Sequence, residues 1–372
     1  FTILSFEKKD RFQKQEKTIR ALMETSGIEW VPLSFSTKPP LLSKFYDSIR
    51  MRQKAISLHK KVKFDMIHCR SYIAADIGLS LKKRFGVKFF FDMRGFWADE
   101  KKDGGSWNVD HPIYKRVYQY YKRKEGEYLQ SADCIVTLTL AAKQEMERWP
   151  HFKTDTYLTV IPCCSDMDHF SITDSFQKAE AKSKLGLSTS SLVLSYLGSI
   201  GTWYMLKEMI LFFKQLKQRY SEAKFLILTH SNTDLLIHEI EKSALNKDDF
   251  IIRSATRQEV PALIKASDIN LSFIKPAYSK ISSSPTKLGE VLSTGIPVIC
   301  NSGVGDVEVI INQTKGGYLI HDFTEMDFKL AIEAIPGLLN LSPSSIRERS
   351  ADFYDLKVGV QKYYEAYQKV LG

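Results

Sequence analysis

Short apolar runs alternate with amphipathic segments along almost the whole chain. Continuous apolar runs predict buried strands, and apolar positions three or four apart predict helices. Repeated strand–helix units predict an α/β protein with parallel sheets that carry helices on both faces. The expected strands are residues 1–6, 28–35, 66–69, 87–92, 134–139, 158–162, 192–197, 225–228, 250–252, 269–273 and 298–300. The clearest expected helices are residues 14–25, 41–61, 74–84, 114–130, 141–148 and one through 206–216 with a single apolar face.

The alternation is interrupted once, by the polar stretch 166–190, which we expect to be a connection. A chain of 372 residues is long for a single hydrophobic core, so two domains are the natural expectation. We assign residues 1–165 to the first and 166–350 to the second. Residues 351–372 are expected to form a separate helix rich in Tyr and Phe. Residues 95–111 are expected to be a loop.

Composition narrows the choice of partner. The net charge is +10, and many of the basic residues lie among the first 63. Such a block suits anionic lipid, nucleic acid or a phosphate-bearing substrate, and a merely solvated helix face is the alternative. No nucleic-acid-binding motif accompanies the charge, so we expect no nucleic-acid partner. The odd number of cysteines, five, argues against a disulfide framework, and their spacing argues against a zinc site.

The most informative stretch is residues 282–300. Ser284 is expected to cap a helix that begins at Pro285 and ends before Gly295. A helix start offers free N–H groups and partial positive charge to an anion. Lys287 adds a full charge there, and Glu290 is placed to hold a pair of hydroxyls. Phosphate beside a diol indicates a nucleotide, whereas a solvated lysine and a surface ion pair are the structural alternative.

Other candidates lie where expected strands end, at the edge where ligands bind parallel sheets. Gly198 and Gly201 flank a turn in which Thr202 can cap a helix, and an ordinary tight turn is the alternative. Residues 303–308 carry two further glycines that allow close approach to a ligand, and a purely structural role, with Glu308 favoured early in a helix, is the alternative. No GxGxxG supports a dinucleotide cofactor, and no GxSxG, HExxH or P-loop is present.

Two strand ends of the first block carry charged residues. Arg70 follows one strand and Arg94 the next, so both are expected on one rim, where they can grip phosphate or an acidic acceptor. Structural pairing of either arginine with Asp92 is the alternative. His68 is a candidate base, although a packed histidine at a strand end is the commoner situation.

Taken together, these motifs resemble those of the retaining nucleotide-sugar glycosyltransferases of family four, also called group 1. The resemblance rests on residues 160–162 with 166–170, 196–198, 266–268, 284–290, 295–298 and 303–308, and it covers most of the chain. It implies the GT-B fold: two Rossmann-like domains face each other across a cleft, and a terminal helix returns to the first. Many members begin with an additional strand and a glycine-rich loop, so we expect that an upstream segment is absent here.

The resemblance also assigns roles. Glu290 matches the second of two glutamates eight positions apart, and Ser282 stands at the first position, which usually contacts the transferred sugar. Ser199 stands where members often have arginine. The implied catalytic residues are Lys287, Arg94 and His68, and the acceptor side has Arg70, Asp92 and Arg94. The implied donor-binding residues are Gly198, Ser199, Gly201, Thr202, Ser254, Ser284, Thr286, Lys287 and Glu290.

The function implied is transfer, with retention, of a sugar from a UDP- or GDP-sugar to a hydroxyl of a glycan or lipid-linked acceptor, as in cell-surface polysaccharide synthesis. Neither a metal nor another cofactor is expected. The expected location is the cytoplasm, with a possible peripheral place on the inner face of the membrane. A GT-B-like sugar-nucleotide epimerase and a non-catalytic nucleotide-sugar-binding protein stay open as alternatives.

Overall fold

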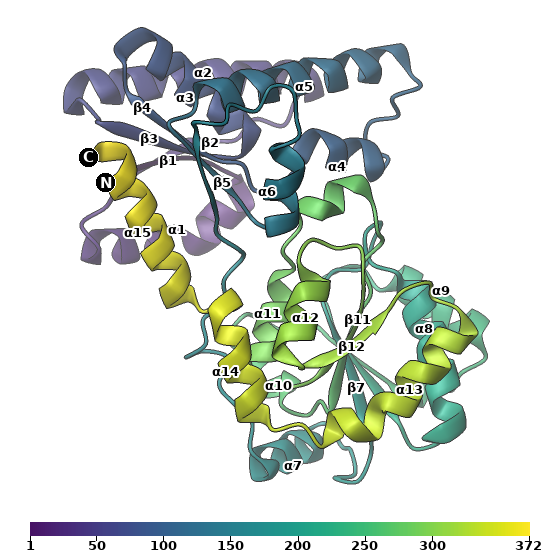
Figure 1. The fold of residues 1–372 in the computed structure, drawn as a ribbon. Coiled ribbons are helices and arrows are strands. Elements are labelled where there is room, and N and C mark those ends of the chain that lie inside the picture. Colours follow the sequence, from purple (N-terminus) through teal and green to yellow (C-terminus); the bar gives the residue numbers. More distant parts are fainter.

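The computed structural model describes the backbone of all 372 residues and the side chains of all except residues 40–42. It contains two α/β bodies, and the C-terminal segment runs along one side of both (Figure 1). Every paired strand is parallel to its neighbours. The predicted fold class, with two Rossmann-like bodies and a helix that returns to the first, is therefore confirmed.

The first body has two separate sheets. One has the order β1-β2, and the other has the order β3-β4-β5-β6. The strands are β1 (Thr2–Glu7), β2 (Glu29–Ser34), β3 (Met66–Arg70), β4 (Lys88–Asp92), β5 (Cys134–Thr137) and β6 (Tyr157–Val160). The helices are α1 (Lys9–Thr25), α2 (Pro40–Val62), α3 (Ser71–Phe85), α4 (Trp97–Asp103), α5 (Pro112–Ser131) and α6 (Leu140–Met146).

Strand β4 forms the centre of the first core. Its apolar run includes Phe89, Phe90 and Phe91, all fully buried, as is usual for a parallel strand covered on both faces. Phe91 packs with Tyr128 of α5 on one face. On the other face, Phe90 packs with Tyr367 from the C-terminal helix. The first domain therefore draws part of its core from the end of the chain.

The second body has one sheet of order β12-β11-β10-β7-β8-β9. The predicted apolar face of the helix through 206–216 is buried against this sheet, so that prediction is confirmed. The strands are β7 (Val193–Leu197), β8 (Lys224–Leu228), β9 (Phe250–Arg253), β10 (Ile269–Ser272), β11 (Val298–Asn301) and β12 (Gly317–Ile320). The helices are α7 (Ser175–Lys184), α8 (Leu206–Arg219), α9 (Asp234–Ser243), α10 (Val260–Ile264), α11 (Thr286–Ser293), α12 (Val307–Thr314) and α13 (Glu325–Leu339), with the 3-10 helices η1 (Lys247–Asp249) and η2 (Tyr278–Ser282).

Several elements differ from the prediction. Helix α4 lies in the expected loop 95–111, and α7 lies in the expected connection 166–190. Both lack a long apolar stripe and are stabilised by polar contacts: Asp174 caps α7, and the buried Lys182 of α7 forms an ion pair with Asp268 at 2.8 Å. Strand β12 was not predicted, because its short run begins at Gly317, a residue unfavourable in strands.

The chain crosses between the bodies twice, and the crossings lie side by side. Ser165 forms a parallel bridge with Asp355, and the N–H of Leu356 donates to the Ser165 carbonyl at 3.1 Å. The expected single helix of residues 351–372 is two helices, α14 (Pro343–Tyr354) and α15 (Leu356–Leu371). They separate because Asp355 is extended and its side chain accepts from the N–H of Lys357.

Candidate functional site

A cavity of about 340 Å³ opens at the carboxyl ends of β7 and β8. Gly198 and Ser199, which follow β7, line one part of it. Lys287 and Glu290, from α11, line another. Four of the predicted donor-binding residues, far apart in sequence, thus share one cavity at the edge of the sheet where ligands bind in this architecture.

Helix α11 begins one residue later than predicted, and its cap differs. Its first residue is Thr286, Pro285 occupies the N-cap, and no side chain caps it. The Ser284 hydroxyl instead accepts the N–H of Cys163 at 3.1 Å, so the prediction that Ser284 caps the helix is wrong. Ser284 therefore contacts the segment where the chain first crosses between the bodies, instead of capping its own helix. The first-turn N–H groups of α11 therefore stay free of a side-chain cap.

Lys287 and Glu290 pair with each other in this structure. The Lys287 ammonium lies 2.7 Å from the Glu290 carboxylate. The lysine side chain is 48% exposed and the glutamate side chain 6%. The ion pair foreseen as the structural alternative is thus present. It also places a half-exposed cation and a buried carboxylate together in the lining of the cavity.

The other predicted donor residues are less central. Gly198 is required by its own neighbour, since a Cβ there would lie 2.6 Å from the hydroxyl oxygen of Tyr196. Ser254 contacts His230, whose Nδ1 lies 2.8 Å from the serine hydroxyl and which itself lines the cavity. Gly201, Thr202 and Thr286 are exposed and do not belong to the lining.

Sequence reasoning missed Arg257, Tyr204 and His230, which also line the cavity. The guanidinium of Arg257 makes no hydrogen bond or ion pair with the side chains that the structure describes. Arg257 lies in the loop after β9, so the rule that loops at carboxyl ends carry ligands would have singled it out. Arg257 thus adds an unpaired positive charge to the wall that Lys287 shares.

The first body has its own cavity, of about 460 Å³, at the carboxyl ends of β3 and β4. His68, Arg70 and Asp92 line it, and α15 closes it. Arg70 lies directly opposite Asp92 in the strand register. Neither Arg70 nor Arg94 forms an ion pair with Asp92 among the described side chains. The direct ion pairs with Asp92 that the structural alternative foresaw are therefore not formed in the described structure.

Asp92 and His68 are held by the C-terminal helix. Tyr363 of α15 donates to Asp92 Oδ2 at 3.0 Å, and His68 Nε2 lies 3.4 Å from the same oxygen. His68 Nδ1 lies 2.6 Å from the hydroxyl oxygen of Tyr367. Burial, followed by the nearby Asp92 carboxylate, raises the pKa of Tyr363 well above its usual range. Because both nitrogens of His68 are engaged, the geometry favours a positioning role over that of a free base.

Arg94 faces the junction of the bodies rather than the His68 cavity. Its backbone is left-handed, with φ of 60°, and its guanidinium donates to the sulfur of Cys163 at 3.1 Å. Desolvation lowers the pKa of Arg94, but Cys163 and Asp92 outweigh this and raise it. Arg94, Cys163 and Ser284 thus form a chain of contacts from the end of β4 to the start of α11.

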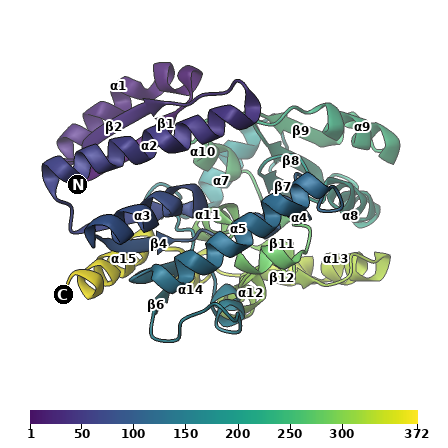
Figure 2. The same ribbon diagram turned by 90° about the horizontal axis from the view of Figure 1, so that it is seen from above.

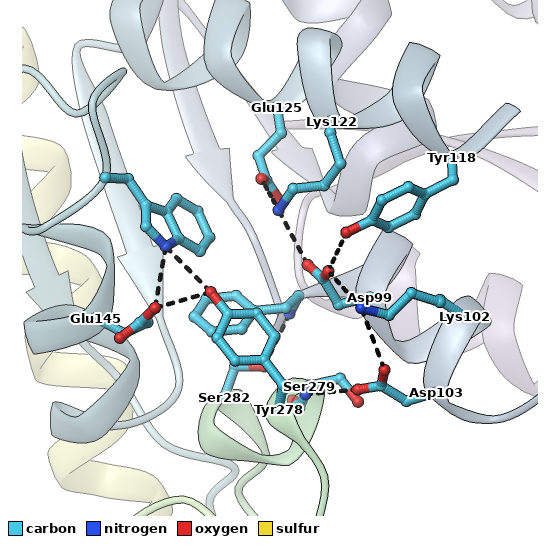
Figure 3. Close-up of polar contacts among 12 residues, drawn as sticks. Asp99, Lys102, Asp103, Tyr118, Lys122, Glu125, Glu145, Tyr278, Ser279 and Ser282 are labelled. Atoms are coloured by element: carbon cyan, nitrogen blue, oxygen red, sulfur yellow. Dashed lines mark hydrogen bonds and ion pairs between the residues drawn. The ribbon is translucent and has the colours of Figure 1, made fainter. Parts of the chain in front are cut away.

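Helix η2, just ahead of α11, is held by the first body (Figure 3). The hydroxyl of Tyr278 donates to Glu145 at 2.8 Å. The N–H of Ser279 donates to Asp103 at 2.9 Å. Ser282 is buried, and its hydroxyl oxygen accepts the N–H of Phe96 at 2.8 Å. Position 282 is therefore occupied by a contact between the bodies and does not line the cavity that contains Lys287 and Glu290.

A buried ionic cluster supports this contact (Figure 3). Asp99 of α4 accepts from Tyr118 at 2.7 Å and from Lys122 at 3.0 Å, and Lys122 also pairs with Glu125. Burial is the main cause that raises the pKa of Glu125, and Lys122 opposes it. The cluster holds α4 on α5, so the surface that receives η2 is braced by buried ionic contacts.

The glycine-containing stretch 303–308 also joins the bodies. A Cβ on Gly305 would lie 2.1 Å from the Ser283 carbonyl oxygen. Both carboxylate oxygens of Asp306 accept N–H groups at the start of α6, from Leu140 at 2.6 Å and Ala141 at 2.9 Å. The close approach that Gly305 allows is therefore to the protein itself. Contact of this stretch with a ligand stays a prediction.

The described residues include no group of three or more His, Cys, Asp and Glu side chains able to hold a metal ion. The five thiols are unpaired, and three of them are fully buried. Within the described part of the chain, no helix has both the length and the apolar character needed to cross a membrane.

Comparison with protein-family models gives two matches. The model described as Glycosyltransferase Family 4 matches residues 2–169. The model described as Glycosyl transferases group 1 matches residues 177–337. Together they span both bodies. A search of curated proteins finds no match in sequence.

Solved structures share the fold at low identity. Sucrose-phosphate synthase from Thermosynechococcus elongatus aligns over 99% of this chain and 98% of its own, with TM-score 0.72 and 13% identity. Anabaena HepE in complex with UDP and glucose aligns over 98% of both chains, with TM-score 0.68 and 13% identity. WaaG, a glycosyltransferase involved in lipopolysaccharide biosynthesis, aligns over 99% of this chain and 98% of its own, with TM-score 0.63 and 15% identity. At these identities the likeness establishes the fold alone.

The contact between α15 and Asp92 can be tested by removing one hydroxyl. Tyr363→Phe deletes the donor to a buried carboxylate whose other oxygen has no partner among the described atoms. We expect it to lower the free energy of unfolding by about 1–3 kcal/mol in urea titrations. The control Tyr364→Phe, on a side chain that is 55% exposed, should change it by less than about 0.5 kcal/mol. Equal losses in the two variants would contradict the assigned role of Tyr363.

Proposed function

Because the chain belongs to the group 1 glycosyltransferases, we propose that it transfers a sugar from a nucleotide-diphosphate sugar to a hydroxyl of a glycan or lipid-linked acceptor. One observation carries the proposal: Lys287 and Glu290 of α11 face the same cavity as the Gly198–Ser199 turn. The cavity thus offers an uncapped helix start, a cation and a buried carboxylate, which suit a diphosphate and a diol.

We place the diphosphate at the start of α11, between Lys287 and the unpaired Arg257, and the ribose hydroxyls on Glu290. Members of the family often have an arginine at the position of Ser199. In this chain, Ser199 would contact the donor through its backbone instead. Neutralisation by these two cations is consistent with transfer that needs no metal. The similar HepE structure is a complex with UDP and glucose, so a UDP-sugar is the first donor to test, and a GDP-sugar the second.

Donor binding would redistribute the charge around Lys287. Its ion pair with Glu290 must open or be shared when a dianionic diphosphate arrives. A lysine at a helix start opposes the helix dipole at a cost of about 0.3–1 kcal/mol, and a bound anion reverses the sign of that interaction. The lysine is therefore positioned for a ligand more than for the free protein.

In the reaction, the bond from the anomeric carbon to the diphosphate oxygen breaks, and a bond to the acceptor oxygen forms. The acceptor hydroxyl gives its proton to the departing diphosphate oxygen. Negative charge grows on the leaving diphosphate, and Lys287 and Arg257 stabilise it. We propose retention at the anomeric carbon through an oxocarbenium-like transition state. The acceptor approaches from the first body, where Arg70 is exposed and Arg94 lies at the junction.

The acceptor side also has features of a membrane surface. Helix α1 exposes Lys9, Arg11, Lys14, Lys17 and Arg20. The first turns of α2 expose Phe45 and Tyr46 beside Lys44. Exposed aromatic rings among basic residues favour the interface of an anionic membrane. We propose that the first body rests on the inner face of a membrane in the cytoplasm and receives a lipid-linked acceptor for polysaccharide synthesis there.

Lys287→Ala tests the catalytic assignment. We expect kcat to fall about a hundredfold or more, because a donor aimed at developing charge contributes roughly 3–4 kcal/mol in comparable sites. Turnover is measured as nucleotide released in the presence of an acceptor, with Lys214→Ala, on the exposed face of α8, as the control. Near-normal turnover in Lys287→Ala would reject the assignment. Release of nucleotide by the wild type without any acceptor would point to the epimerase reaction.

Glu290→Gln tests the ribose contact. In thermal-shift titrations with UDP- and GDP-sugars, a donor concentration far above its Kd should stabilise the wild-type protein by about 3 kcal/mol. The variant should need markedly more donor for the same gain, because a neutral amide holds a diol less well than a carboxylate. An unchanged donor Kd would remove Glu290 from the site. Binding without transfer, across many acceptors, would favour the non-catalytic alternative.

Sedimentation with liposomes tests the membrane contact. We expect the protein to pellet with phosphatidylserine-containing vesicles at low salt and to be released as salt rises, because exposed lysines act through screened electrostatics. Vesicles of neutral lipid are the control. Equal partition with neutral and acidic vesicles, or none with either, would remove the proposed contact.

A further inference from the structure

A cavity of about 1030 Å³, larger than the two described above, lies along the outer side of α5. Figure 2 shows α5 on the surface of the first body, with α3 between it and α2. Lys124 of α5 pairs with Asp76 of α3 at 3.2 Å. Lys122 and Gly126 line the cavity two positions to either side of Lys124, so the cavity lies on the side of α5 away from α3. We refer to it as the α5 groove.

The α5 groove is long and has walls from separate segments. One wall is α5 itself, from Arg116 to Leu129, which spans about 20 Å at 1.5 Å per residue. The facing wall consists of residues 149–151, which follow α6, together with Tyr278 of η2. The walls approach closely at Gly126, where a Cβ would lie 3.2 Å from the His151 ring. A groove of this length suits about six residues of extended polypeptide better than a compact ligand.

The charge in the α5 groove is predominantly positive. Lys122 bonds to Asp99 at 3.0 Å and also pairs with Glu125, so these charges are satisfied within the protein. Arg116 and Arg123 are exposed and make no side-chain hydrogen bond or ion pair with the residues that the structure describes. They lie seven positions apart, on one face of α5 and about 10 Å from each other along its axis. The four cations and two carboxylates of the lining are Lys102, Arg116, Lys122, Arg123, Asp99 and Glu125.

The aromatic rings of the facing wall are already packed against other side chains. The Lys122 ammonium lies 4.6 Å from the centre of the Trp149 ring, and the Phe96 ring lies 4.8 Å from it. Tyr278 stacks on Phe96, with 5.6 Å between the ring centres. Nucleobases bind by stacking on free aromatic faces, and sugar rings use such faces too, so this lining disfavours both. Arginine beside aromatic side chains is instead typical of protein–protein interfaces.

We propose that the α5 groove binds an extended, acidic segment of a partner protein. Its carboxylates accept charge-assisted hydrogen bonds from Arg116 and Arg123. Gln119 and His151 line the same groove, and their side chains have no polar partner among the described residues, so they are available to its backbone. A second copy of this chain is a poor occupant, because its net charge is +10. A contact of this size belongs to the weak, transient class of interfaces.

Selection from a display library of random peptides tests the proposal on the 372-residue chain. The peptides have about twelve residues, twice the length that the α5 groove accommodates. Peptides selected on the wild type should be enriched in Asp and Glu. A synthetic member, followed by fluorescence anisotropy at low salt, should bind Arg116→Gln/Arg123→Gln about tenfold or more weakly than the wild type. Its affinity for the wild type should fall as salt rises, because the arginines are exposed.

Two further variants control the experiment. Lys214→Gln/Arg349→Gln removes the same charge from exposed positions outside the groove and should bind the peptide like the wild type. His151→Glu places a negative charge on the facing wall and should weaken binding about tenfold or more, which distinguishes the groove from the outer face of α5. All these changes are at exposed side chains, so the variants should retain the Tm of the wild type within about 2–4 °C.

Several outcomes would overturn the proposal. Selected peptides without an acidic bias, or equal affinity for the wild type and the arginine variant, would do so. Unchanged binding to His151→Glu would place the peptide outside the groove. Competition by tripolyphosphate or by an oligogalacturonide, as strong as that by unlabelled peptide, would assign the groove to a small polyanion or an acidic glycan. Peptide binding is measured without donor or acceptor, so its failure is separate from any failure of the proposed transfer.

Discussion

The contact between η2 and the first body fixes the position of the wall that α11 gives to the cavity with Lys287 and Glu290. Every residue of η2 from Tyr278 to Ser282 bonds to that body, through side chain or backbone. Helix α11 begins four residues after Ser282. Between them, the hydroxyl of Ser284 accepts the N–H of Cys163, which lies where the chain first crosses between the bodies. The start of α11 is therefore fixed from outside its own domain. Any change in the angle between the bodies moves the lysine and the uncapped N–H groups together.

This arrangement offers a physical reason for serine, instead of the family's usual glutamate, at position 282. A glutamate there would bring a longer, charged side chain into a buried site where Ser282 now accepts from Phe96 and donates to the Ser279 carbonyl. An unpaired buried carboxylate is costly, so the serine belongs to a junction in which the bodies meet tightly. In the proposed reaction, contact with the transferred sugar would come from another residue, and Arg257 and His230 are polar residues already in the cavity.

The sequence predicted those parts of the site that depend on local pattern. The strand ends, the turn at Gly198 and the helix with Lys287 and Glu290 all follow from turn chemistry and periodicity over a few residues. Contacts between distant segments could not be read in this way. The cap of α6 by Asp306 spans 166 positions, and the bond between His68 and Tyr367 spans 299. The same kind of contact between distant segments removed Ser284 from its expected cap and brought Gly305 against the backbone of Ser283.

The two bodies differ in how self-sufficient they are. The second has a continuous sheet of six strands, and its cavity is built from its own loops together with α11. The first has an interrupted sheet, and its cavity is closed by α15, which supplies the hydrogen bond that Asp92 receives from Tyr363. Removing α15 would leave a buried carboxylate with no partner other than His68 among the described groups, which is unfavourable. The cavity of the first body is thus assembled from segments at both ends of the polypeptide. Its geometry therefore depends on the docking of α15, whereas the geometry of the second cavity depends chiefly on the contacts between η2 and the first body.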